Sequence, residues 1–91
     1  METKITFEEY LRKENLSENT ITSYLWTVNY FNANYDVVSK ENLLAYKGYL
    51  MEFFKPKTVN LRIQAINKYL EYLDKQQLQL KAVKVQQKNF L

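Results

Sequence analysis

The residue types that most often carry out enzyme chemistry are scarce in this chain of 91 residues. It contains no cysteine and no histidine, so thiolate chemistry and the commonest general base and metal ligand are missing. Glu8 and Glu9 are adjacent, and on a helix their side chains would point about 100° apart, which does not make an acid–base pair. The eight tyrosines have no cluster of Arg and His that could activate one as a nucleophile. We therefore expect no catalytic activity, no metal site and no cofactor.

Binding through hydrogen bonds is the chemistry that the sequence favours. Two stretches place amide, hydroxyl and basic side chains at helical spacing beside an apolar stripe. Asn and Gln pair with adenine, and Arg and Lys pair with guanine or with phosphate. The residues that could contact DNA are Asn19, Thr22, Ser23 and Trp26 in the first stretch, and Lys57, Thr58, Asn60, Arg62, Gln64 and Lys68 in the second.

Each of these residues also has an ordinary structural interpretation. Thr58 is explained at least as well by a helix N-cap as by a contact. Trp26 is equally consistent with the rim of a core and with a contact surface. The remaining residues could be solvated positions on the outer face of a helix.

Basic side chains gather in the second half of the chain. The net charge is only +3, but from residue 47 onward nine bases are opposed by three acids. The bases are Lys47, Lys55, Lys57, Arg62, Lys68, Lys75, Lys81, Lys84 and Lys88, and the acids are Glu52, Glu71 and Asp74. A basic half suits a polyanion, because phosphate contacts gain affinity by releasing counterions. A solvated lysine surface is the plainer alternative.

Four helices are predicted, and capping signals mark the start of the first three. Thr6 and Glu9 form a capping box, while Ser17 and Ser39 are N-caps that each follow an apolar residue in the staple position. Pro56 falls in the third connection, because proline interrupts a helix. The expected helices span residues 7–13, 18–32, from 40 to the 54–57 connection, and 58–75, with a loop at 32–36.

The fold class follows from this helical pattern and from the composition. One glycine and one proline in the whole chain argue against a fold of strands and turns. The single glycine, Gly48, lies inside the third helix at a cost of about 1 kcal/mol and suggests the close approach of another helix. The sequence thus predicts an all-α fold: one small four-helix bundle over 1–75 and a flexible tail or linker over 76–91.

Apolar stripes at the helical period identify the expected core. The stripe of the third helix includes Leu44 and Phe53, and that of the fourth ends at Leu73. The full set is Phe7, Tyr10 and Leu11 in the first helix, Ile21, Tyr24, Leu25, Val28 and Phe31 in the second, Leu43, Leu44, Tyr46, Tyr49, Leu50 and Phe53 in the third, and Val59, Ile63, Ile66, Leu70 and Leu73 in the fourth, with Tyr69 at its edge.

No segment suggests a membrane or a secretory route. No apolar run approaches the ~20 residues that span a bilayer. The start of the chain, Met-Glu-Thr-Lys, lacks the basic-then-apolar form of a signal peptide. With no cysteine to indicate an oxidising compartment, we expect a cytoplasmic protein that does not bind membranes.

Two segments in a defined order carry a family resemblance. The first is Leu-Ser-Glu-Asn-Thr-Ile at 16–21, followed by Tyr24, Val28 and Phe31. The second is Thr-Val-Asn-Leu-Arg-Ile-Gln-Ala-Ile at 58–66, followed by Tyr69, Tyr72 and Leu73. Together they resemble the second and fourth helices of the core-binding domain of tyrosine recombinases, the phage-integrase family. The resemblance covers roughly residues 5 to 75.

The resemblance implies a SAM-like domain that forms one half of a clamp around double-stranded DNA. It implies a non-catalytic module of a phage- or transposon-type integrase, which positions recombination-site DNA for strand exchange by a separate catalytic domain. No part of this chain matches that domain, which would be a partner within the same chain if the sequence is a fragment of a longer one. We expect the chain to be a monomer in isolation and to assemble on DNA. Basic residues that the family often carries near Asn67 and near Leu25 or Trp26 are missing here, so fewer phosphate contacts are expected.

Two other functions fit the same residues. The first is a helical protein–protein interaction module whose Tyr and Trp side chains pack on a partner protein. The second is a stand-alone helix-turn-helix regulator. Salt separates the first from DNA binding, because phosphate contacts weaken steeply as salt rises and apolar docking does not.

Overall fold

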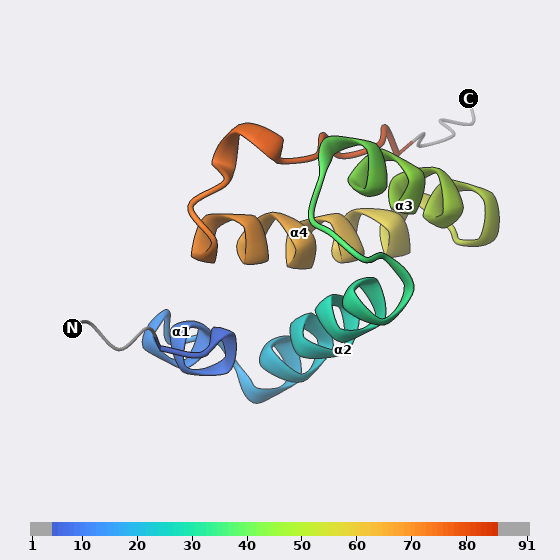
Figure 1. Cartoon of the computed structure of the whole chain (residues 1–91). Coiled ribbons are helices and arrows are strands. Elements are labelled where there is room, and N and C mark those ends of the chain that lie inside the picture. Colours follow the sequence, from blue (N-terminus) through green and yellow to red (C-terminus); the bar gives the residue numbers. More distant parts are fainter. Residues whose placement is uncertain (1–4, 86–91) are drawn as a thin grey trace, which may run out of the picture.

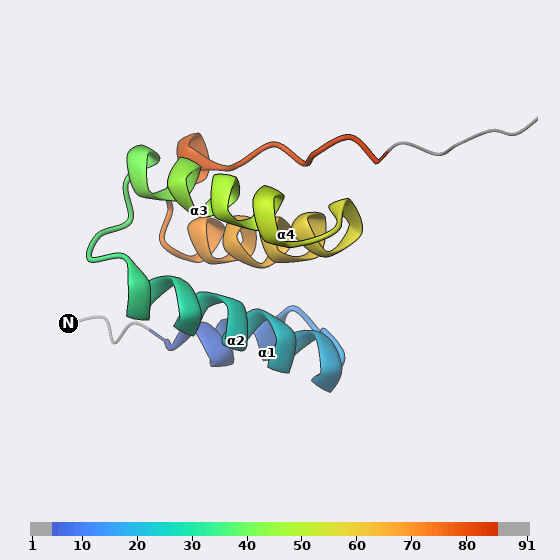
Figure 2. The same cartoon turned by 90° about the vertical axis from the view of Figure 1, so that its right-hand side faces the viewer.

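Helix α4 is the element on which the others pack in the computed structural model (Figure 1). The structure describes residues 5–85. These form α1 (Phe7–Lys13), α2 (Glu18–Asn34), α3 (Lys40–Phe53), α4 (Pro56–Tyr72) and one 3₁₀ turn, η1 (Gln76–Leu78). Helices α1 and α2 lie on one side of α4, and α3 lies on the other (Figure 2). The predicted all-α, four-helix bundle is confirmed.

The first three helices begin where the capping signals predict. The hydroxyl of Thr6 accepts from the Glu9 amide at 3.1 Å, and the Glu9 carboxylate accepts from the Thr6 amide at 2.8 Å. These bonds favour the charged carboxylate and lower the pKa of Glu9. The hydroxyls of Ser17 and Ser39 each accept from the amide three residues on, at 3.2 and 3.1 Å. Local hydrogen bonding therefore marks where these three helices start.

Helix α2 is longer than its asparagines suggest. It continues to Asn34, so the loop predicted from residue 32 is wrong over its first residues. The Asn34 side-chain amide donates to the Tyr30 carbonyl at 2.8 Å, and the Tyr35 amide donates to the Phe31 carbonyl at 2.9 Å. Asparagine here satisfies carbonyls at the end of the helix instead of ending it earlier.

Helix α4 begins and ends earlier than predicted. Pro56 is its first residue, where the missing amide hydrogen costs nothing, and Lys55 is the N-cap. Thr58 therefore lies in the first turn, and its predicted role as the cap is wrong. The helix ends at Tyr72, because Asp74 takes a left-handed conformation with φ 61° and reverses the chain.

The core is formed by one apolar stripe from each helix, with Phe31 and Tyr46 as its largest members. Burial raises the pKa of the Tyr46 phenol to about 12. The buried set is Phe7, Leu11, Ile21, Val28, Phe31, Leu43, Tyr46, Leu50, Val59, Ile63, Ala65, Ile66, Leu70 and Leu80. The one buried polar residue among those described is Thr27, whose hydroxyl donates to the Ser23 carbonyl at 2.9 Å.

Four residues pack differently from what the sequence predicts. Leu44 and Phe53 are exposed, at 50% and 64%, because they lie at the edges of the stripe on α3 and no other helix covers them. Gly48 is also exposed, and a Cβ added there would meet nothing within 4 Å. No close helix approach explains this glycine. Leu73 lies just beyond α4 and is only partly buried.

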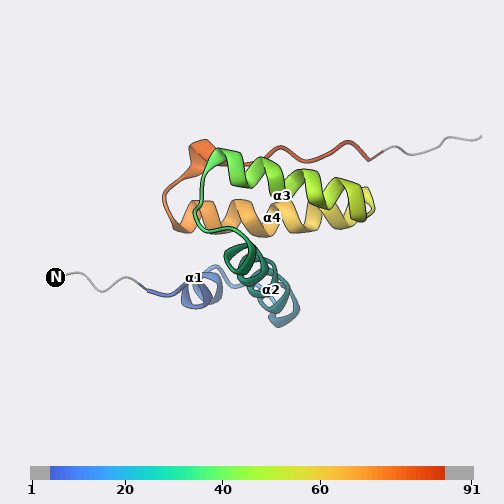
Figure 3. The same ribbon diagram turned by 45° about the vertical axis from the view of Figure 1, so that its right-hand side comes forward.

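After η1 the chain turns back and runs as an extended segment beside α3 and α4 (Figure 3). We call residues 79–85 the strap. Leu80 is buried against the core, and Val83 packs on it in part. η1 and the strap thus make up the described portion of the tail that the sequence places after residue 75, and the remainder, 86–91, lies outside the described residues. Within 5–85 no helix has the length and apolarity needed to cross a membrane.

Candidate nucleic-acid interface

A cleft of about 230 Å³ opens between the first half of α2 and the middle of α4. Three of the residues predicted to contact DNA line it: Asn19 and Ser23 from α2, and Gln64 from α4. Thr20, Tyr24 and Leu61 complete the lining. Packing of the two apolar stripes brings these faces together, although the residues are about 40 positions apart in the sequence.

The cleft combines apolar surface with hydrogen-bonding side chains and carries no charge. None of its six lining residues is acidic or basic. Glu18 is the nearest carboxylate along the sequence, and Arg12 holds it through a close hydrogen bond that lowers the pKa of Glu18. Amide and hydroxyl groups can hydrogen-bond the edges of bases, and a cleft without cations gains no affinity from the charge of phosphates.

Trp26 and Arg62 form a bridge beside this cleft. The Arg62 guanidinium carbon lies 4.6 Å from the centre of the Trp26 ring, and Nη1 donates to the Thr27 hydroxyl at 3.2 Å. Trp26 also stacks on Tyr30 at 5.8 Å between ring centres, yet remains 54% exposed. Arg62 therefore links α4 to α2. None of the ion pairs among the described residues involves Arg62, and the DNA contact predicted for it stays a prediction.

Lys68 is engaged within the molecule as well. Its ammonium lies 2.7 Å from a Glu14 oxygen and 3.1 Å from a Glu71 oxygen, and its side chain is 21% exposed. The hydrogen bond that Lys68 donates to Glu14 is the main cause that raises the pKa of Lys68 to about 12, with Glu71 adding to it. Lys68 ties α1 to α4, and two carboxylates offset its charge. It is thus poorly placed to serve the DNA contact predicted for it.

Asn60 was predicted to contact DNA, but its side chain holds the strap. Its amide nitrogen donates to the Val83 carbonyl at 3.0 Å, and its oxygen accepts from the Val83 amide at 2.7 Å. Asn67, two turns along the helix, makes the same pair of bonds to Leu80, each at 2.8 Å. Each side-chain amide therefore gives one N–H and one oxygen lone pair to the strap, and the DNA contact predicted for Asn60 stays a prediction.

The remaining predicted contacts fall at different places. Thr22 is exposed on α2, although it does not line the cleft. Thr58 is partly buried in the first turn of α4. Lys57 is exposed and lines a separate hollow of about 450 Å³ with Lys55 and Lys84. The structure thus joins three predicted residues in one cleft and separates the others.

The sequence reasoning missed several groups that the structure places on the surface. Lys55 and Lys84 come together at the start of α4, although they are 29 positions apart, and Lys81 is exposed on the strap. The excess of lysine after residue 47 was a signal for basic surface, but no local pattern shows which of these lysines become neighbours. Comparison with protein-family models, with curated proteins and with solved structures finds no match to this chain.

Proposed function

We propose that this chain is a double-stranded DNA-binding module that reads base edges through the α2–α4 cleft. The observation that supports the proposal is the meeting of Asn19, Ser23 and Gln64 in one neutral, hydrogen-bonding cleft. In keeping with the family resemblance, the module would act in the cytoplasm as part of a phage- or transposon-type integrase. It would orient recombination-site DNA for a separate catalytic domain, and it contributes binding energy and orientation, not bond chemistry.

The spacing of the exposed residues on α4 supports this use. Lys57, Leu61 and Gln64 are spaced by four and three residues, so they form one stripe along the helix. An α-helix fits the major groove of B-DNA, where amide side chains reach the donors and acceptors of the base pairs. On the other wall of the cleft, Asn19 and Ser23 are one turn apart on α2. Polar side chains from two helices can then contact neighbouring base pairs.

An NMR titration with a generic duplex of ~20 base pairs at low salt tests the proposal. We expect the side-chain amides of Asn19 and Gln64 and the backbone amide of Ser23 to shift, and added salt to reverse the shifts. The chain has one tryptophan, so a change in Trp26 fluorescence on binding gives an independent readout beside the cleft. Shifts that avoid all these positions would remove the cleft from the interface.

A matched pair of variants sharpens the test. Gln64→Ala removes a hydrogen-bonding side chain from the cleft, and affinity should fall about fivefold, as expected for one lost hydrogen bond of about 1 kcal/mol. Gln76→Ala makes the same chemical change at an exposed position in η1, away from the cleft, and affinity should not change. Equal effects of both variants would contradict the assignment.

A protein-interaction module is the second candidate, and one surface favours it. Met51, Phe53 and Phe54 are all exposed at the end of α3, and Met51 and Phe54 line a hollow of about 240 Å³. An apolar surface of this kind suits a partner protein or the catalytic domain of a longer chain. Duplex binding that is absent at low salt would favour this second function.

A further inference from the structure

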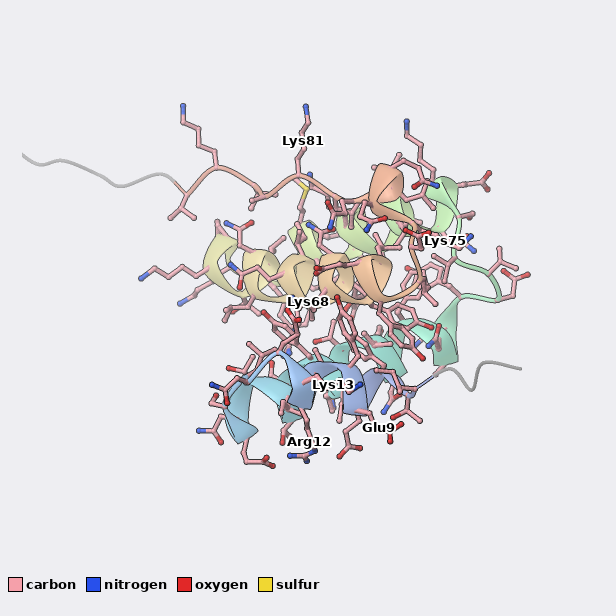
Figure 4. All side chains as sticks on the ribbon, turned by 90° about the vertical axis from the view of Figure 1, so that its left-hand side faces the viewer. Glu9, Arg12, Lys13, Lys68, Lys75 and Lys81 are labelled. Atoms are coloured by element: carbon pink, nitrogen blue, oxygen red, sulfur yellow. The ribbon has the colours of Figure 1, made fainter. Side chains whose placement is uncertain are left out.

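The strap is held so that two lysines face outward. Asn60 and Asn67 bind the main chain of residues 83 and 80, and these two residues turn their side chains toward the core. Lys81 and Lys84 are exposed, and Lys81 extends away from the helices (Figure 4). Three residues of extended chain span about 10 Å. Over about 10 Å along the axis of B-DNA, one strand presents about three phosphates.

Lysines from three elements gather beside the strap. The three hollows that flank it are lined by six lysines and by no acidic residue. We call this set the lysine ridge, and it comprises Lys40, Lys47, Lys55, Lys57, Lys81 and Lys84. The acids of α3, Glu41 and Glu52, do not line any of the hollows. The ridge is therefore a surface of one sign of charge.

The lysines of the ridge keep their charge available. The ion pairs among the described residues involve Arg12 and Lys68, and none involves a lysine of the ridge. Lys47 donates to the Lys81 carbonyl at 2.6 Å, which fixes the Lys47 side chain against the strap backbone without neutralising its charge. Unpaired cations that lie close together repel one another, and a polyanion relieves that repulsion when it displaces their counterions.

We propose that the lysine ridge binds the sugar–phosphate backbone of duplex DNA and provides the salt-dependent part of the affinity. This inference rests on the proposed function and adds to it the place where phosphates bind. The neutral cleft contacts bases, and the ridge on the α3 side of α4 contacts phosphates. The two asparagines of α4 position the strap lysines in advance, so binding does not have to order the strap.

The test measures duplex affinity between 50 and 200 mM salt by fluorescence anisotropy, with the full chain and two double variants. Lys81→Gln with Lys84→Gln removes two ridge charges, and the slope of log affinity against log salt should fall by about two. Lys13→Gln with Lys75→Gln makes the same change in net charge at two exposed lysines that line none of the hollows. This control should leave the slope unchanged.

Each alternative result has a defined meaning. If the full chain binds duplex and both double variants lower the slope equally, the ridge is overturned and DNA binding stands. If the ridge variant alone lowers the slope while Gln64→Ala has no effect, the ridge stands and the cleft is removed. If the full chain binds vesicles of anionic lipid but no duplex, both proposals are overturned. Circular dichroism of each variant checks that the exposed substitutions leave the helices intact.

Discussion

The two flanks of α4 use their polar residues in opposite ways. On the flank that faces α1 and α2, the cations Arg62 and Lys68 are engaged with Thr27, Trp26 and two glutamates. On the flank that faces the strap, two neutral asparagines make the internal bonds, and the lysines remain unpaired. Charge holds the molecule together on the first flank, while amides hold the strap on the second and leave its charge exposed.

This difference teaches that the charge counted in a sequence is not the charge available to a ligand. Arg62 and Lys68 look like the best phosphate contacts by type and position, yet each already has partners inside the molecule. Lys81 and Lys84 lie in a tail that no helical pattern covers, yet they are fixed and exposed. The proposed DNA surface therefore depends on which partners the fold assigns to each cation.

The largest expected effect compares how much the α2 flank and the strap each contribute to the free energy of unfolding. Phe31 is fully buried and contacts Tyr35 and Tyr46 at 4.9 and 5.6 Å between ring centres. Phe31→Ala should cost about 3–5 kcal/mol of unfolding free energy, measured by urea denaturation. Leu80→Ala on the strap should cost only about 2 kcal/mol, because that segment can move to fill the space. Equal costs would break the distinction between the flanks.

The next effect concerns the strap alone. Asn67→Ala removes both bonds to Leu80 and should cost about 1–3 kcal/mol, because the Leu80 amide and carbonyl lose their partner. Hydrogen exchange should show faster exchange at residues 80 and 83 and unchanged protection in α2. Asn29→Ala, at an exposed position on α2, is the control and should change neither. Loss of protection throughout the bundle would mean that the strap is part of the global folding unit.

A stabilising change comes third and should leave both flanks unaltered. Gly48 is exposed within α3 and an added Cβ meets no atom within 4 Å, so Gly48→Ala should stabilise the protein by about 1 kcal/mol. Thermal denaturation gives the size of the gain, and duplex affinity should not change. A loss of stability would show that position 48 makes contacts beyond those of the described residues.

The smallest effect separates a structural cation from a binding one. Lys68→Gln should cost at most about 1 kcal/mol, because the partner carboxylates are well exposed. Since the pKa of Lys68 is raised from 10.5 to about 12, its contribution is complete below pH 10.5 and is lost as the pH rises toward 12. The stability difference between wild type and variant, followed by urea denaturation, should shrink over that range. The salt slope of duplex binding should not change, unlike that of the ridge variant.

Local signals predicted most of the fold. The capping box at Thr6 and the serine caps are short-range patterns that a sequence displays directly, and all three form as expected. The boundaries that failed, at Asn34 and Pro56, involve residues whose role depends on whether they lie inside or at the end of a helix. The role of each of these residues depends on the geometry of the complete helix, which the local sequence does not show.

The candidate site was predictable only in part. The residues that share the cleft could be found, because helical period places Asn19 and Ser23 on one face of α2 and Gln64 on one face of α4. The roles of Asn60 and Lys68 could not, because their partners are 23 and 54 positions away in the sequence. Such pairings depend on how the helices pack, and no local pattern shows them.

The asparagine bonds to the strap allow its outward side chains to vary while its backbone stays in place. Asn60 and Asn67 bind carbonyl and amide groups that every residue except proline provides. The anchoring of the strap therefore does not depend on the side chains at 81, 82 and 84. Evolution could replace Lys81 and Lys84 by glutamate or by alanine without moving the strap. Relatives of this domain could thus differ widely in the ligand they attract while keeping the same anchored backbone. Protein engineering could likewise substitute these positions to bind a new partner without changing the bundle.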